Sequence, residues 1–208
     1  MSPFAFVRGG KIRDIPELSR LASHGRRLDR TGKRRADLAR TPHSPAGSIY
    51  CDDPLDLVAA HHACLAAKDA VAYGRAAIGL NLLVGVTPDL IREAGDLHDP
   101  ENPNNKALIK HSIEWAESVF GEGSVFAWRL DLDETGGALV DLFLAPTRIA
   151  RMNRDCEKKI ISVHHMLEAV RVEYEEQKSF SALQTSWAIY AAAHLDARDA
   201  DHPHGDRR

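Results

Sequence analysis

Cysteine is scarce and long hydrophobic runs are absent in this chain of 208 residues. The three cysteines (Cys51, Cys64 and Cys156) include no CxxC pair, which argues against a disulfide framework or a cysteine-based metal cluster. The most apolar stretch, Leu80–Val86, is far shorter than the roughly 18 residues that a membrane-spanning helix needs. Met1–Arg8 has neither the basic start nor the cleavage site of a signal peptide. We therefore expect a cytoplasmic protein with no membrane partner.

Acidic residues are also scarce in the first forty residues. This segment has eleven lysines and arginines against four acids, a net charge of +7, so the remaining 168 residues carry −10. A basic end on an acidic body favours a polyanionic partner, because lysine and arginine bind phosphates without reading the base sequence. We predict that this segment contacts DNA; the alternative is a solvated loop. The predicted DNA contacts are Arg26, Arg27, Arg30, Lys33, Arg34 and Arg35.

The pattern of apolar residues predicts an α+β domain with a largely antiparallel sheet. Short apolar or alternating segments, bounded by turn residues, predict strands over 4–7, 77–86, 124–134 and 139–145. We expect these four strands to pair into one antiparallel sheet.

Helical spacing of apolar residues predicts the helices, the first of which begins after a capping aspartate, Asp14. Helices 54–73 and 106–120 are expected to pack on one face of the sheet. The basic segment 25–48 has glycine, proline and serine but no apolar period, so it is predicted to be a loop. The other predicted helices cover 14–24, a short segment over 87–95, 167–177 and 180–195.

The clearest local signal is a hairpin that turns at Gly136-Gly137. A three-residue loop would place Leu132 opposite Leu142 and keep one face of the hairpin apolar, whereas a two-residue loop would put a charge on that face. The other face then carries three aspartates, with Asp133 opposite Asp141. Directly opposed like charges are unfavourable unless a cation or a base lies between them. A metal ion could play this part, or Arg129 on the same face could neutralise the acids alone.

Two short motifs carry a family resemblance. One is Trp128-Arg-Leu-Asp131-Leu-Asp133-Glu134-Thr135 followed by Leu142-Phe-Leu-Ala-Pro146, and the other is His24-Gly25-Arg26-Arg27. They resemble motifs of the Mob/Pre plasmid recombination family, also called MobV-type relaxases. The family's third motif reads H-x-D-E-T-x-P-H-x-H before a short apolar strand ending in Val-Pro. Its first motif, H-N-x-R, follows an N-terminal strand and helix, as His24 does here.

This resemblance implies a relaxase-like (HUH-type) domain. Relaxases bind a plasmid origin of transfer and nick one DNA strand through a covalent protein–DNA link. A divalent metal held by the third motif polarises the scissile phosphate, and the first-motif histidine is the nucleophile, a role that carries over to His24. A side-chain nucleophile of this kind stores the bond energy for rejoining the strand.

The metal motif departs from the family pattern. Asp131 stands where the first ligand histidine is expected, and the two later histidines have no counterpart in either alignment of the hairpin. Carboxylates can still hold a hard cation, because Mg²⁺ and Mn²⁺ prefer oxygen ligands. The predicted metal ligands are therefore Asp131, Glu134 and Asp141.

Two hypotheses of function follow. The retained His24 and Asp133-Glu134 favour a metal-dependent DNA strand transferase, whereas the lost histidines favour a non-catalytic DNA-binding module with the same fold. A third option is a truncated copy of a longer family member. A second copy of the chain is also kept as a candidate partner. We expect a relaxase-like DNA-binding domain over 1–146, a C-terminal strand and helices packed on it over 147–196, and a disordered tail over 197–208.

Overall fold

The main sheet has five strands, and every neighbouring pair is antiparallel. The computed structural model describes residues 5–134, 136–137, 139–153 and 156–195, so the tail expected over 197–208 lies outside the described residues. The predicted antiparallel sheet is confirmed, including a strand within 77–86. In spatial order the strands are β1 (Phe6–Ile12), β4 (Gly79–Gly85), β6 (Leu139–Leu144), β5 (Val125–Leu130) and β2 (Ala46–Gly47).

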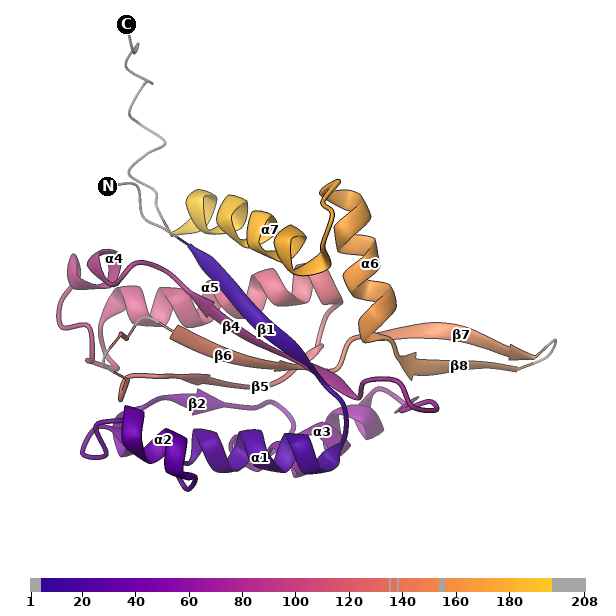
Figure 1. The fold of residues 1–208 in the computed structure, drawn as a ribbon, viewed down its shortest axis with the longest axis horizontal. Coiled ribbons are helices and arrows are strands. Elements are labelled where there is room, and N and C mark those ends of the chain that lie inside the picture. The colour runs from indigo at the N-terminus through magenta and orange to yellow at the C-terminus, as the bar shows by residue number, and fades with distance from the viewer. Residues whose placement is uncertain (1–4, 135, 138, 154–155, 196–208) are drawn as a thin grey trace, which may run out of the picture.

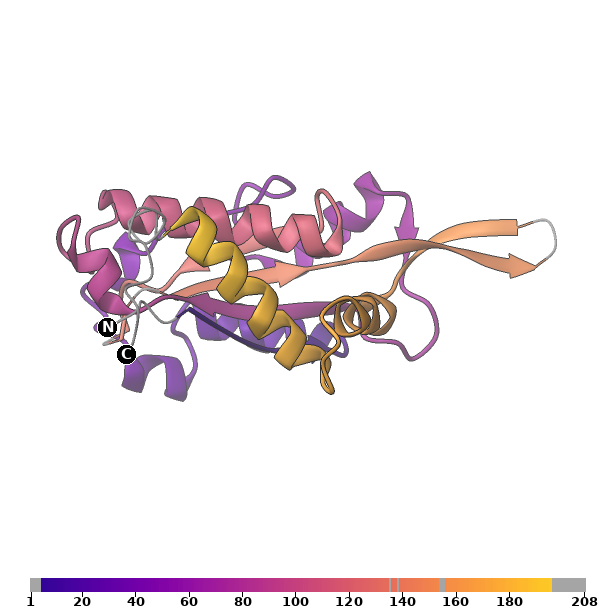
Figure 2. The same ribbon diagram turned by 90° about the horizontal axis from the view of Figure 1, so that it is seen from above.

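A second, smaller sheet extends from one end of the molecule. Its order is β3 (Ala70–Val71), β8 (Cys156–Ile161) and β7 (Thr147–Asn153), with β3 parallel to β8 and β7 antiparallel to it. The two long strands β7 and β8 project away from the body, at the end opposite α2 (Arg30–Arg35) (Figures 1 and 2).

The first helix begins at a capping side chain that the sequence supplies. Asp14 accepts a hydrogen bond from the backbone N–H of Glu17 at 2.8 Å and caps α1 (Ile15–Gly25), as predicted. No helix of the described residues is long and apolar enough to cross a bilayer. The other helices are α3 (Leu57–Ala67), α4 (Pro88–Arg92), α5 (Pro103–Phe120), α6 (Val163–Glu173) and α7 (Ser179–His194), with a single 3₁₀ turn at Thr41–His43.

The segment 25–48 is not the loop that its composition predicts. It contains α2 and β2, because Asp29 caps α2 by accepting from the N–H of Gly32 at 2.8 Å. Gly32 is buried against the end of α1, where an added Cβ would lie 3.3 Å from the Arg27 side chain. A helix of six residues is held by this cap and this contact rather than by its own helix propensity.

Helices cover both faces of the sheet, which corrects the expectation of one covered face. α5 and α7 pack on one face, whereas α1 and α3 pack on the other (Figure 1). The strands explain this arrangement. On β6, Leu142 belongs to the hydrophobic core under α5 and α7, and its neighbour Phe143 belongs to the core under α1 and α3. Because successive side chains of a strand point to opposite faces, an apolar residue at both positions requires two covering layers.

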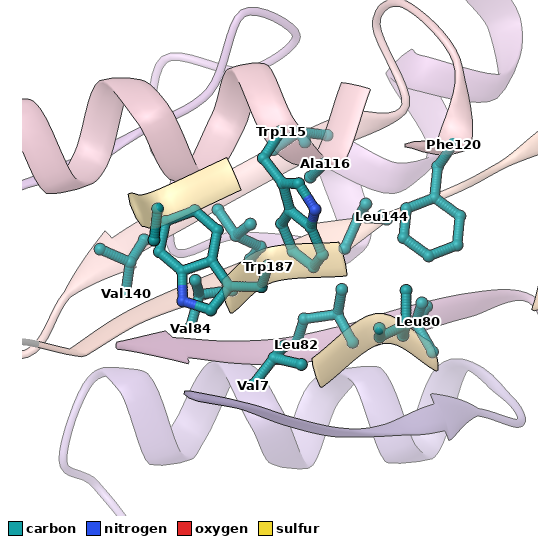
Figure 3. Packing of buried hydrophobic residues seen from close by; sticks show 14 of the residues in the cluster. Val7, Leu80, Leu82, Val84, Trp115, Ala116, Phe120, Val140, Leu144 and Trp187 are labelled. Carbon is teal, nitrogen blue, oxygen red and sulfur yellow. The ribbon is translucent and has the colours of Figure 1, made fainter. Parts of the chain in front are cut away.

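Two tryptophans anchor the α5–α7 face (Figure 3). Trp115 and Trp187 are fully buried, with ring centroids 5.3 Å apart. The Trp187 indole N–H donates to the carbonyl of Gly85 at 3.0 Å, and that of Trp115 donates to Ser186 Oγ at 3.0 Å. Both polar atoms are thus satisfied inside the core, as buried indoles require.

The hairpin register differs from the prediction by four residues. Leu142 pairs with Trp128 rather than with Leu132, and Asp141 pairs with Arg129 rather than with Asp133. The apolar face survives because the shift is even, and side chains alternate with a period of two. The chain leaves the strand after Leu130, and the aspartates that follow turn toward arginines instead of opposing Asp141.

Candidate functional site: a buried arginine–carboxylate cluster beside a basic helix

The predicted site residues gather on the α1–α3 side of the sheet. Arg129 and its partner Asp141 lie on the same strand face as Ala127 and Phe143, which contact α1 and α3. The end of α1 adjoins this face, since a Cβ added at Gly25 would lie 3.9 Å from Arg129 Cδ. The hairpin and the end of α1 therefore meet at one place, although about one hundred residues separate them in the sequence.

Arg27 is the link between these two segments. Its Nη2 atom lies 2.7 Å from Asp131 Oδ1 and 2.7 Å from Asp133 Oδ1, and its Nε donates to Asp133 Oδ2 at 2.9 Å. Its Nη1 lies 3.4 Å from Glu134 Oε1. Only 2% of Arg27 is exposed. The prediction of Arg27 as a phosphate contact is therefore corrected, because its guanidinium is already committed to buried acids.

A second buried arginine completes the cluster. Arg129 is 2% exposed; its Nη1 pairs with Asp131 and its Nη2 donates to Asp133 Oδ2 at 3.0 Å. Thr41 Oγ1 donates to the same Asp133 oxygen at 2.8 Å. Asn81 Nδ2 lies 3.4 Å from Asp141 Oδ1. Arg129 therefore neutralises acids of the hairpin, which is one of the two alternatives that the sequence left open.

The electrostatics of the cluster follow from burial and from these pairs. Burial raises the pKa of Asp131, and burial together with the charge of Asp131 raises the pKa of Asp141. Burial also opposes ionisation of Asp133, but hydrogen bonds from Arg27 and Thr41 outweigh it and hold its pKa well below the ordinary value. Asp133 is thus the carboxylate that the two arginines keep ionised.

His24 lies at the end of α1 and is half-buried. Its Nδ1 lies 2.9 Å from Asp29 Oδ2, and each of the two side chains is 33% exposed. Its backbone carbonyl accepts from the N–H of Arg27 at 2.9 Å. The structure therefore brings His24 next to the residue that enters the cluster, but its ring has Asp29 as its hydrogen-bond partner among the described residues.

The basic residues of α2 lie on the surface. Each of the four is exposed, and none has an ion-pair partner within the described part of the chain. Arg26 differs, because its Nη2 lies 2.5 Å from Asp53 Oδ2. The sequence-predicted phosphate contacts that remain unpaired are Arg30, Lys33, Arg34 and Arg35.

Solved structures of another protein are similar to this chain in fold. The MobM relaxase domain (MOBV; Mob_Pre), in a Mn-bound crystal structure with 22 nucleotides of plasmid pMV158 oriT DNA, matches with a TM-score of 0.55 and 12% identity over 86% of each chain. A complex of MobM with 23 nucleotides matches with a TM-score of 0.56 and 11% identity, over 96% of this chain and all of the other. The chain has the fold of the MobM relaxase domain.

The relaxase fold that the two motifs implied is thereby confirmed, and the identity is too low to carry more than the fold. No family model matches the sequence, and no curated protein matches it. The short motifs around His24 and Asp133 therefore found a likeness that whole-chain sequence comparison does not detect.

The residues at the predicted metal position of this relaxase fold do not fit a metal ion. Among the described residues, no group of three or more histidine, cysteine or acidic side chains is arranged to hold one. Asp131 lies near both Glu134 and Asp141, the other predicted ligands, but Arg27 pairs with Asp131 and Glu134, and Arg129 pairs with the same oxygen of Asp131. The assignment of these three acids as metal ligands therefore stays a prediction, and the contacts of Arg27 and Arg129 argue against it.

Sequence reasoning missed two members of the cluster and assigned a third to another role. Thr41 and Asn81 carry no sequence signal, since neither belongs to a motif. Arg27 was found for the wrong role, because a run of bases looks the same whether its members face solvent or a distant acid. One signal could have identified it: four acids lie within residues 131–141 of a hairpin that must pack against something, and they require cations.

Proposed function

We propose that this chain is a plasmid mobilisation or recombination protein that binds DNA on a relaxase fold and does not cut it. The observation that carries the proposal is the exposed, unpaired basic surface of α2 on that fold. The relatives of known structure were crystallised with oriT DNA, so an origin of transfer is the DNA to test first.

The position of α2 supports this proposal. Asp29 caps the helix, and the buried Gly32 seats it on the end of α1, so the basic side chains project from an ordered helix rather than from an irregular loop. A backbone that is ordered before binding lowers the entropy lost on contact with phosphates.

Salt dependence tests the proposal. If the four bases of α2 each contact one phosphate of duplex DNA, log K should fall against log salt with a slope of about −3.6. Replacing Arg34 and Arg35 together by alanine should reduce the magnitude of the slope by about 1.8 and weaken binding to all sequences alike. Fluorescence anisotropy with a labelled oligonucleotide, across a salt series, measures both quantities.

The matched control is the pair Lys158 and Lys159 on β8. These two residues are also exposed and adjacent, and their replacement by alanine removes the same charge at the opposite end of the molecule (Figure 1). This control should leave the slope unchanged. Equal losses in the two double variants would contradict a specific role for α2, and no salt-dependent binding at all would contradict DNA binding itself.

A strand transferase is the second candidate, and the pairing of His24 with Asp29 favours it. When Asp29 accepts the Nδ1 proton, Nε2 keeps its lone pair and could attack a phosphate, as a nucleophile oriented by a carboxylate does. Such an enzyme would form a P–N bond and release a DNA oxygen at the nick. It would also require the Mg²⁺ or Mn²⁺ that the family resemblance implies, which the residues at the cluster do not fit.

A nicking assay separates the two candidates. With supercoiled plasmid carrying an origin of transfer, and with Mn²⁺ or Mg²⁺ present, we expect the wild-type chain to leave the plasmid supercoiled while a gel shift shows binding. Nicking by the wild type that disappears in His24→Ala, with binding intact, would replace the proposed function by the second candidate. An Asp29→Asn variant tests whether the carboxylate orients the ring.

A further inference from the structure

The buried acids Asp131, Asp133 and Glu134 are neutralised by arginine side chains of the same chain. We infer that the guanidinium groups of Arg27 and Arg129 take the place of the divalent ion, so that this chain has a relaxase fold that needs no metal for folding or for binding DNA. The inference does not depend on the proposed function, because it concerns what neutralises the carboxylates.

Asp131 and Asp133 both accept hydrogen bonds from the two arginines. Asp131 Oδ1 receives an N–H from each arginine, and both oxygens of Asp133 receive N–H groups from Arg27. Arg129 and Thr41 add two more donors to Asp133 Oδ2. Asp131 Oδ1 and Asp133 Oδ2, which accept two and three hydrogen bonds, have no lone pair left to offer a metal ion. A metal ion that used either oxygen would therefore have to displace an arginine.

The charges of the cluster also leave little need for a metal ion. The two buried guanidinium ions of Arg27 and Arg129 balance the charges of Asp131 and Asp133, so these two carboxylates need no further cation, and the cluster has no excess of positive charge. A divalent ion placed among them would also be repelled by two fixed positive charges at close range, with little solvent to screen them. The same balance bears on chemistry, since a centre without net positive charge does not stabilise the charge that develops on a phosphate during transfer.

The backbone of Arg27 adopts an unusual conformation. Arg27 has a φ of 55°, in the left-handed region that a non-glycine residue rarely adopts. Its ion pairs and the neighbouring Gly32 hold it there. A residue in an unfavourable backbone conformation persists only when its surroundings favour that conformation, so the position of Arg27 is built into the fold.

Thermal unfolding with and without metal tests the inference on the intact chain. At a Mn²⁺ concentration about 100-fold above its Kd, a bound ion would raise the Tm of a domain of this size by roughly 5–10 °C. We expect the wild type to shift by less than about 1 °C between EDTA and millimolar Mn²⁺, and its affinity for DNA to be the same in both. A Tm rise of several degrees, or stoichiometric Mn²⁺ binding by electron paramagnetic resonance, would overturn the inference.

Two variants of Arg129 add an expected rise in Tm to the absence of a rise that is expected for the wild type. Arg129→Ala should unfold at a lower temperature and should then gain several degrees on addition of Mn²⁺, because the acids it leaves behind need a cation. Arg129→Lys keeps the charge and should show no such gain. A folded Arg129→Ala protein that Mn²⁺ does not stabilise would contradict the substitution of arginine for metal. If Arg129→Ala does not fold, the wild type and Arg129→Lys decide the outcome, since a Tm rise with Mn²⁺ in either overturns the inference.

Discussion

Replacing Asp133 by alanine is expected to lower the free energy of unfolding by about 3–5 kcal/mol, because it leaves Arg27 and Arg129 buried with one carboxylate fewer to neutralise them. Asp133 accepts hydrogen bonds from both arginines and from Thr41, and it is 1% exposed. Removing one partner of a buried ion pair costs much more than the pair contributes, since the remaining charge stays desolvated. Urea denaturation followed by circular dichroism gives the difference directly.

Asp37→Ala is the control for this change. Asp37 has the same side chain and also pairs with an arginine, Arg40 at 3.3 Å, but the two side chains are 52% and 46% exposed. Exposed pairs contribute about 0–1 kcal/mol, so this variant should be close to the wild type. If the two substitutions cost the same, the cluster is not the buried network described above.

Replacing Trp187 by alanine should also cost about 3–5 kcal/mol, as large-to-small changes in a core do. Trp187 is fully buried in the core (Figure 3). It stacks with Tyr190 at a ring-centroid distance of 6.1 Å, and its indole N–H donates to the carbonyl of Gly85 on β4. Its loss removes apolar contacts and leaves the Gly85 carbonyl without its indole donor. The measurement is again the urea midpoint, with the slope checked for two-state behaviour.

Ile189→Ala, on the same helix, is the matched control. Ile189 is 60% exposed, so its truncation should change stability by less than about 0.5 kcal/mol. DNA binding gives a second readout, because α2 lies on the other side of the sheet from α7 (Figure 1). A folded Trp187→Ala protein should keep the salt slope of the wild type. A Trp187→Ala protein as stable as the wild type would contradict α7 as part of the core.

Much of the local structure could be predicted because it depends on neighbours in the chain. Asp14 caps α1 through a residue three positions later, and the alternation of apolar residues gives strands β5 and β6. The relaxase resemblance came from the same local kind of signal, the short motifs around His24 and Asp133. Such features survive in a single sequence because their partners are within a few residues or repeat with a fixed period.

The helix faces, the hairpin register and the cluster could not be predicted in this way. An apolar strand such as β6 shows that both of its faces are buried but not which helix covers each face. In the observed register Asp141 pairs with Arg129, and the Asp131 and Asp133 side chains turn toward Arg27, which is 106 residues from Asp133. No pattern within either segment records that contact.

The sequence by itself determined an α+β chain with a basic end, an acidic body and the outline of a relaxase motif. Only the tertiary structure decided which bases face solvent and which face acids. The physical reason is that an arginine has the same local signature in both settings, whereas its environment depends on residues that folding brings from far along the chain. Arg27 and Arg34 lie seven positions apart, yet one is buried among carboxylates and the other is exposed on α2.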